Sequence, residues 1–203
     1  MRRSRRPPAP WALLSLLLRY PDERVVAGCD EVAALHDGPV RVSLERFVAE
    51  WREPRAEHYV QTFDLRRRAS LELTYYAHGD TRERGMALLR LKKLYRAAGL
   101  PMSSRELPDH LTVMLAFAAL APAGHGEALL AEHRPAIELL RLSLHDLESP
   151  YAHVLDAIAA CLPTLSVGDR TEVARLAREG PPDEAVGLEP YGPPEAMPSG
   201  ARP

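Results

Sequence analysis

Apolar side chains recur three and four positions apart along most of this chain. One such stripe falls on Leu44, Phe47, Val48 and Trp51. This is the spacing of residues that share one face of an α-helix. No segment shows the strict alternation of apolar and polar residues that is typical of a strand. The pattern predicts an all-α protein, a single-domain bundle of roughly eight to ten helices.

Proline, glycine and capping residues divide this pattern into segments. A short apolar helix is expected from Trp11 to Arg19, because Pro21 cannot continue it. Ser43 is expected to cap a later helix. Pro135 lies inside a helical pattern and is expected to kink or divide it. Further helices are expected at about 22–35, 80–98, 108–120 and 127–147, and others begin near 55, 149 and 169.

Two of these helix starts involve acidic residues. Asp80 and Glu83 have the spacing of a capping box. Pro108 suits a first helical turn, and Asp109 suits the positive end of the helix dipole. The helix that follows Asp109 is apolar nearly all round, so we expect it at the centre of the bundle.

The two ends of the chain differ from its middle. Residues 1–10 carry arginines at positions 2, 3, 5 and 6 ahead of the apolar run Trp11–Leu18. No small-residue cleavage site follows that run, and it is far shorter than the roughly 20 residues needed to cross a bilayer. We therefore expect a basic flexible extension at 1–10 rather than a secretory or twin-arginine signal. A helical domain is expected at 11–180 and a flexible tail at 181–203, where seven of the 19 prolines lie.

Composition excludes some classes of function. The 26 basic and 28 acidic residues give a formal net charge of −2 and a pI near 6.5, so no overall field favours nucleic acid. Cys29 and Cys161 each occupy an apolar position of a helical pattern. This indicates buried thiols in a reducing compartment and not a disulfide framework.

Candidate metal ligands do not form a known pattern. His125 and His133 are eight positions apart, as are His145 and His153, and eight positions exceed two helical turns. No Cys-x-x-Cys or His-Glu-x-x-His pattern accompanies them, and the chain has no Gly-x-Gly-x-x-Gly or Walker-type loop. We expect scattered surface histidines, no metal and no cofactor.

Asp109 and His110 are the best candidates for a catalytic pair in a small helical enzyme. Neighbours one position apart on a helix point in different directions. No Gly-x-Ser-x-Gly elbow marks a nucleophile. The preferred interpretation of this pair is therefore helix-start electrostatics.

Three segments resemble a known family. Residues 59–64 read Tyr-Val-Gln-Thr-Phe-Asp, residues 79–85 read Gly-Asp-Thr-Arg-Glu-Arg-Gly, and residues 106–111 read Glu-Leu-Pro-Asp-His-Leu. With weaker matches at 17–22, 149–155 and 188–190, they resemble the nitrate reductase delta-subunit family of NarJ-type assembly chaperones over most of residues 11–190. The chain departs from the family pattern at His110, Thr112 and Ala116. An acidic residue followed by histidine is also common in the wider TorD and DmsD chaperone group.

The resemblance implies an all-helical, TorD-like chaperone in the cytoplasm and not an enzyme. Its expected partner is the immature alpha subunit of a nitrate reductase, including the N-terminal segment of that subunit, until molybdenum cofactor is inserted. It implies no nucleic-acid partner and no membrane insertion, with the chain acting as a monomer or a homodimer. A chaperone for the leader peptide of another, exported molybdoenzyme is the alternative.

The resemblance also carries a hypothesis for the binding site. An amphipathic helix of the client would lie in an apolar groove. The expected apolar wall consists of Tyr59, Phe63, Leu107 and Leu111. Carboxylates facing basic client groups are expected at its rim, with His110 beside them: Asp64, Glu106 and Asp109.

The same motifs have a second interpretation, in which they serve packing. The expected structural residues of the motifs are Gly79, Asp80, Arg84, Gly85 and Pro108. Glycines and prolines at these positions suit turns, close packing and helix ends. Tyr59 and Phe63 suit the inside of a bundle equally well.

Overall fold

The computed structural model describes residues 9–53, 55–102 and 106–182. Within these ranges the chain forms eleven α-helices and no strand, which confirms the all-α class. The helices are α1 (Trp11–Leu17), α2 (Glu23–Asp30), α3 (Pro39–Glu50), α4 (Arg55–Tyr59), α5 (Leu73–His78), α6 (Arg82–Ala97), α7 (Leu111–Leu120), α8 (His125–Glu132), α9 (Arg134–Asp146), α10 (Tyr151–Cys161) and α11 (Val167–Glu179).

Three short helical segments supplement them. A 3-10 helix at Glu31–Ala34 extends α2, and another at Arg67–Ala69 precedes α5. A π-helix at Val60–Asp64 continues α4. Single-turn π-helices are uncommon and often lie at functional sites, so this one marks a segment to inspect.

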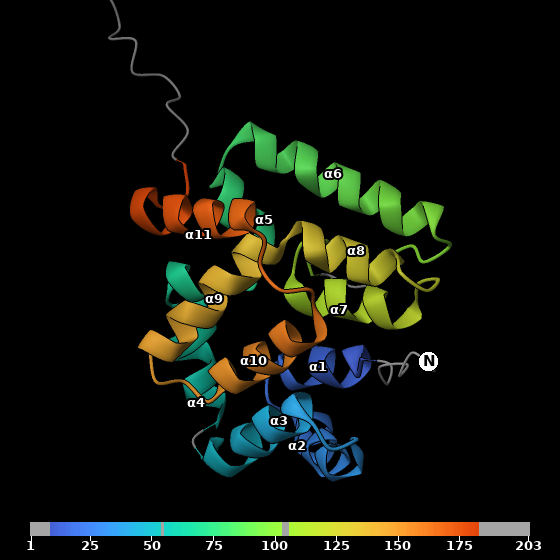
Figure 1. The fold of residues 1–203 in the computed structure, drawn as a ribbon, viewed down its shortest axis with the longest axis vertical. Coiled ribbons are helices and arrows are strands. Elements are labelled where there is room, and N and C mark those ends of the chain that lie inside the picture. Colours follow the sequence, from blue (N-terminus) through green and yellow to red (C-terminus); the bar gives the residue numbers. More distant parts are fainter. Residues whose placement is uncertain (1–8, 54, 103–105, 183–203) are drawn as a thin grey trace, which may run out of the picture.

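The core is built around α1, α7 and α10. Helix α1 packs on α7, while α10 packs on α3 and α9 (Figure 1). Leu111, Met114 and Leu115 of α7 are fully buried. This confirms the central position expected for a helix that is apolar nearly all round. In Figure 1, α6 and α11 lie at one end of the molecule and α2 and α3 at the other.

Aromatic side chains form a second part of the core between α3, the α4 region and α10. Phe47, Trp51, Tyr59 and Phe63 all surround Tyr151, with ring centroids 4.9–6.5 Å from its own. The Trp51 Nε1–H donates to the Tyr151 hydroxyl at 3.0 Å. Tyr59 and Phe63 are therefore core residues at 8% exposure each, as the packing interpretation predicted.

Two helix starts differ from the expectation. Helix α3 begins at Pro39, so Ser43 lies inside it and caps nothing; proline is well suited to a first helical position. Helix α6 begins at Arg82, and the residue before it accepts no capping hydrogen bond through its side chain. The Asp80 and Glu83 capping box is therefore wrong, and Asp80 instead forms an ion pair with Arg84 at 3.0 Å.

Later boundaries agree in part. Pro135 divides its segment, because α8 ends at Glu132 and α9 begins at Arg134. Helix α7 begins only at Leu111, so Pro108 and Asp109 precede the helix instead of forming its first turn. The last helix, α11, has its capping box between Ser166 and Asp169, three residues earlier than expected.

Some expectations concern residues at the ends of the chain or their surroundings. The basic extension falls mainly on 1–8 and the tail mainly on 183–203, which are outside the described residues. In the part that is described, no helix is long and apolar enough to cross a membrane. Cys29 and Cys161 are only half-buried, so they are less enclosed than expected.

Candidate functional site

A groove of about 670 Å³ lies between α1, the π-helix, the C-terminal end of α6 and the exposed side of α7. Its size is that of an ordinary ligand pocket. Apolar side chains from α7 and from the connection after α6 supply most of its apolar lining: Leu100, Met102, Val113, Ala116, Phe117 and Leu120. Helix α7 packs on α1 and α8, and its residues Val113 and Ala116 line the groove.

The groove has an acidic rim. Asp22 follows α1, Asp64 ends the π-helix, and Glu106 precedes α7; all three carboxylates are exposed. Arg19 is the single arginine or lysine among the described lining residues. The rim is therefore negative and suits a basic ligand, for which exposed carboxylates raise the encounter rate more than the affinity.

His110 gives the groove a polar, uncharged side chain. Its Nδ1 lies 2.7 Å from the Thr112 hydroxyl. Burial lowers the pKa of His110 below 6.5, although Glu106, Glu72 and other nearby carboxylates oppose the shift. The imidazole is thus neutral at pH 7, and a hydrogen-bonding group lies beside the apolar lining.

The structure brings four of the eight predicted binding residues into this groove: Tyr59, Asp64, Glu106 and His110. Phe63 belongs to the aromatic core, and Leu111 is fully buried beneath the groove. Leu107 is exposed but does not line the groove. Phe63, Leu107 and Leu111 therefore do not belong to the wall of this groove, and their role in client binding stays a prediction.

Asp109 is also misplaced by the prediction, because it is fully buried and not at the rim. Pro108 and Asp109 form a turn that is closed by a hydrogen bond from the His110 N–H to the Leu107 carbonyl at 3.1 Å. His110 itself is extended and pairs with Glu72 in an isolated antiparallel bridge. His110 lines the groove, whereas the turn places the Asp109 side chain in the interior.

The buried carboxylate of Asp109 joins two of the three motif segments. Its Oδ2 accepts hydrogen bonds from the Thr74 backbone N–H at 3.1 Å and from the Thr74 hydroxyl at 2.5 Å. The Arg84 guanidinium lies 3.7 Å from the same oxygen and also pairs with Glu72 and Asp80. We call Glu72, Thr74, Asp80, Arg84 and Asp109 the Asp109 cluster.

The other motif residues have structural roles. Gly79 has φ +57°, and a Cβ there would lie 1.8 Å from the Pro182 carbonyl oxygen, so only glycine fits this turn. Pro108 is buried, and its carbonyl accepts a hydrogen bond from the Tyr95 hydroxyl at 2.6 Å. A Cβ at Gly85 would meet open space, so close packing does not explain Gly85.

The sequence interpretation missed one side of the groove, which is supplied by Arg19, Tyr20 and Asp22. Tyr20 is 54% exposed, and its ring meets that of Tyr59 edge-on at 5.5 Å. The signal for this side was the weak family resemblance of residues 17–22. No periodic pattern marks it, because Arg19 to Asp22 lie between helices.

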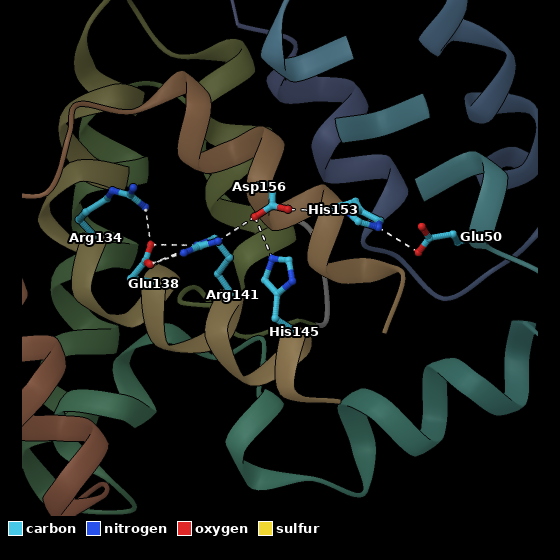
Figure 2. A network of polar contacts seen from close by, with 7 residues as sticks. All are labelled: Glu50, Arg134, Glu138, Arg141, His145, His153 and Asp156. Atoms are coloured by element: carbon cyan, nitrogen blue, oxygen red, sulfur yellow. Dashed lines mark hydrogen bonds and ion pairs between the residues drawn. The ribbon is translucent and has the colours of Figure 1, made fainter. Parts of the chain in front are cut away.

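A second set of charged residues, none of which lines the groove, connects α3, α9 and α10 (Figure 2). Asp156 accepts hydrogen bonds from Arg141 at 2.9 Å and from His145 at 3.0 Å, and the His153 ring lies 3.6 Å from its other oxygen. We call this set the Asp156 cluster; its members are Glu50, Arg134, Glu138, Arg141, His145, His153 and Asp156.

The Asp156 cluster corrects the expectation of scattered histidines. His145 and His153 have ring centroids 6.3 Å apart. A spacing of eight separates two residues by more than two turns only on one continuous helix. Helix α9 ends at Asp146 and α10 begins at Tyr151, so the chain turns between the two histidines and brings them together. Among the residues that the structure describes, no group of three histidine, cysteine or acidic side chains could hold a metal ion.

An all-α protein with an open apolar groove and an acidic rim is suited to hold a basic, partly apolar segment of another chain. A family described as the nitrate reductase delta subunit matches residues 34–157. The chain belongs to this nitrate reductase delta-subunit family, which confirms the resemblance seen in the sequence.

The names of individual relatives agree with this family. A Bacillus subtilis (strain 168) protein, named a probable nitrate reductase molybdenum cofactor assembly chaperone NarJ, is 34% identical over 172 residues, which are 81% of this chain and 94% of the relative. The Escherichia coli (strain K12) assembly chaperone NarJ is 35% identical over 61% of this chain and 53% of its own length. The nitrate reductase-like protein NarX of Mycobacterium tuberculosis (strain H37Rv) is 40% identical over 152 residues, 73% of this chain. The match spans only 23% of NarX.

Proposed function

We propose that this chain is an assembly chaperone for a nitrate reductase and not a catalyst. In this proposal it binds the apo form of the catalytic alpha subunit in the cytoplasm, including its N-terminal segment. It then assists insertion of the molybdenum cofactor before the subunit reaches the membrane. The Bacillus subtilis and Escherichia coli relatives are named as chaperones of this kind, and the groove is the observation on which the binding mode depends.

The groove can accommodate part of a peptide ligand. A helix is about 10–12 Å across with its side chains, so a space of about 670 Å³ takes a few side chains from one face of it. The apolar lining would bury those side chains, and Asp22, Asp64 and Glu106 would face basic groups beside them. His110 would offer a neutral hydrogen-bond partner.

The enzyme alternative receives no support from the geometry. Asp109 is buried while His110 lines the groove, and no hydrogen bond joins their side chains in the described structure. A catalytic pair needs both groups within reach of one proton. One oxygen of Asp109, Oδ2, instead accepts two hydrogen bonds from Thr74 and lies 3.7 Å from the Arg84 guanidinium.

Calorimetric titration tests the proposal. The ligand is a synthetic peptide that matches the N-terminus of the nitrate reductase alpha subunit from the same organism. A leader peptide from an exported molybdoenzyme is the control. We expect saturable one-to-one binding of the first peptide and much weaker binding of the second. The reverse preference would favour the alternative client, and failure of both peptides to bind would remove the N-terminal segment from the proposal.

Two variants locate the binding site. Ala116→Trp fills the groove with a ring, whereas Ala119→Trp places the same ring on an exposed position of α7 outside it. We expect the first to abolish peptide binding and the second to leave it unchanged, with equal helicity by circular dichroism. Equal affinities in the two variants would exclude the groove.

A charge variant tests the rim. Asp64→Asn with Glu106→Gln removes two exposed carboxylates, and Glu31→Gln with Asp146→Asn removes two exposed carboxylates elsewhere. Exposed ion pairs contribute about 0.2–1 kcal/mol each. We expect the rim variant to bind about two- to thirty-fold more weakly than the control variant, with the difference shrinking at high salt.

A further inference from the structure

The segment 106–110 is held from behind by α6 at two points. The Tyr95 hydroxyl donates to the Pro108 carbonyl at 2.6 Å, and the Arg84 guanidinium lies 3.7 Å from the Asp109 carboxylate. Arg84 and Tyr95 are eleven residues apart, or about three turns of α6. Helix α6 therefore supports nearly the whole segment that presents Glu106 and His110 to the groove.

Asp109 also completes the start of α5. The residue before this helix offers no side-chain cap. The Leu73 backbone N–H donates to the Asp109 carbonyl at 3.1 Å, and the Thr74 N–H donates to its carboxylate at 3.1 Å. The first N–H groups of a helix need such external acceptors. On the far side, the Leu111 N–H donates to the Leu71 carbonyl at 2.8 Å, so the segment is pinned on both sides of Asp109.

The charges of this cluster are placed for geometry and not for maximal stability. The Arg84 side chain is 12% exposed and its charge is shared among three carboxylates. Asp109 Oδ1 and Arg84 Nε are buried without a hydrogen-bond partner among the described residues. A buried ion pair of this kind adds little net stability over an apolar pair, but it restricts the chain to one arrangement.

We propose that Arg84 is a positioning residue for peptide recognition: together with Thr74 it fixes Asp109, and thereby holds Glu106 and His110 in the groove, without contacting the peptide itself. The inference rests on the proposed function for its link to the peptide. Arg84 does not line the groove, whereas Glu106 and His110 of the segment that it supports do. The contact between Arg84 and Asp109 thus joins two family motifs, at 79–85 and 106–111.

The test compares Arg84→Gln with Arg90→Gln. Arg90 is exposed on the same helix and forms no ion pair within the described chain, so it controls for loss of one positive charge. Residues that act through others change binding energies by about 0.5–2 kcal/mol. We expect folded Arg84→Gln to bind the alpha-subunit peptide about two- to thirty-fold more weakly than wild type, and Arg90→Gln to bind as wild type does. Arg84→Lys should recover only part of the loss, since it restores the charge but not the planar fork.

A second measurement needs no peptide. The His110 imidazole is followed by NMR as the pH is changed, in wild type and in both variants. His110 faces the carboxylates of Glu72, Glu106, Asp109 and Asp64, and burial outweighs them. If the segment loosens in Arg84→Gln, water reaches the imidazole, and the pKa of His110 should rise towards 6.5.

The outcomes separate the two proposals. If wild type does not bind the peptide, the proposed binding mode fails, and the His110 titration still decides whether Arg84 positions the segment. An Arg84→Gln variant that is less stable but has wild-type affinity and an unchanged His110 titration would make Arg84 purely structural and overturn the inference. Equal losses in Arg84→Gln and Arg90→Gln would overturn it too. If Arg84→Gln does not fold, Thr74→Val removes one hydrogen bond to Asp109 at nearly constant shape and must show the same two changes at smaller size.

Discussion

The Asp109 cluster and the Asp156 cluster use the same kinds of residue in opposite ways. Asp109 is fully buried, and backbone N–H groups as well as side chains hold it. Asp156 is 25% exposed at its side chain, and it contacts side chains of α9 and α10 (Figure 2). The first cluster joins the turn before α7 to the starts of α5 and α6. The second adds polar contacts to helices that already pack on one another.

This difference shows that burial and backbone contacts decide what a charged residue does. Helices α9 and α10 would stay together through their apolar faces without Asp156. The segment 106–110 is not helical, and polar contacts from α5 and α6 hold it at Pro108 and Asp109. A charged cluster beside a loop can therefore shape a binding site, while a similar cluster between packed helices mainly adds stability.

The largest difference is expected between Asp109→Leu and Asp156→Leu. The first substitution leaves the Thr74 N–H and the Arg84 charge without their acceptor in the interior. Such a loss costs about 2–4 kcal/mol of unfolding free energy. Asp156→Leu should lower the unfolding free energy by about 1 kcal/mol or less, because water can take the place of the carboxylate at its former partners. Urea denaturation followed by circular dichroism measures both, and equal losses would contradict the comparison.

A smaller difference concerns salt. The Asp156 cluster is partly exposed, so added salt should screen it. We expect the stability gap between wild type and Asp156→Asn to shrink between low salt and 1 M salt, while the gap for Asp109→Asn stays nearly constant. Parallel urea titrations at the two salt concentrations check this, and a salt-sensitive Asp109→Asn gap would argue against its enclosure.

The smallest expected effect is that His110 and Asp156 change the stability of the protein in different pH ranges. Burial lowers the pKa of His110 below 6.5, so the unfolded chain takes up this proton first and stability falls as the pH drops below 6.5. Burial raises the pKa of Asp156, but hydrogen bonds from His145 and Arg141 outweigh it, and the pKa lies below 3.8. The stability that Asp156 contributes is therefore present above pH 3.8 and is lost as the pH falls below that value.

Two variants test these windows. Wild type should lose stability relative to His110→Gln between pH 6.5 and 5, and Asp156→Asn should run parallel to wild type over that range. Below pH 3.8 the gap between wild type and Asp156→Asn should close. Thermal unfolding at a series of pH values gives both curves. A His110→Gln curve parallel to wild type down to pH 5 would show that His110 does not cause the loss of stability between pH 6.5 and 5.

Much of the fold was predictable because helices have a fixed period. Helix α7 is apolar nearly all round and lies at the centre, and Pro135 divides α8 from α9 as a residue without a backbone donor should. The expectation for Ser43 was wrong because a residue that can cap a helix is also tolerated inside one. Here the helix already begins at Pro39, after Gly38. Four of the predicted binding residues line the groove because their motifs adjoin α7 and the π-helix.

The sequence by itself determined the helical class, the family and the segments that surround the groove, because helical periodicity and motif order are properties of neighbouring residues. Only the tertiary structure decided that Asp109 points inward while His110 faces the groove, and that His145 meets His153. The side chains before α7 follow no helical period, and their directions are set by partners far away in the chain, such as Thr74, 35 positions from Asp109. A contact of that range is made by packing, so no local pattern could place it.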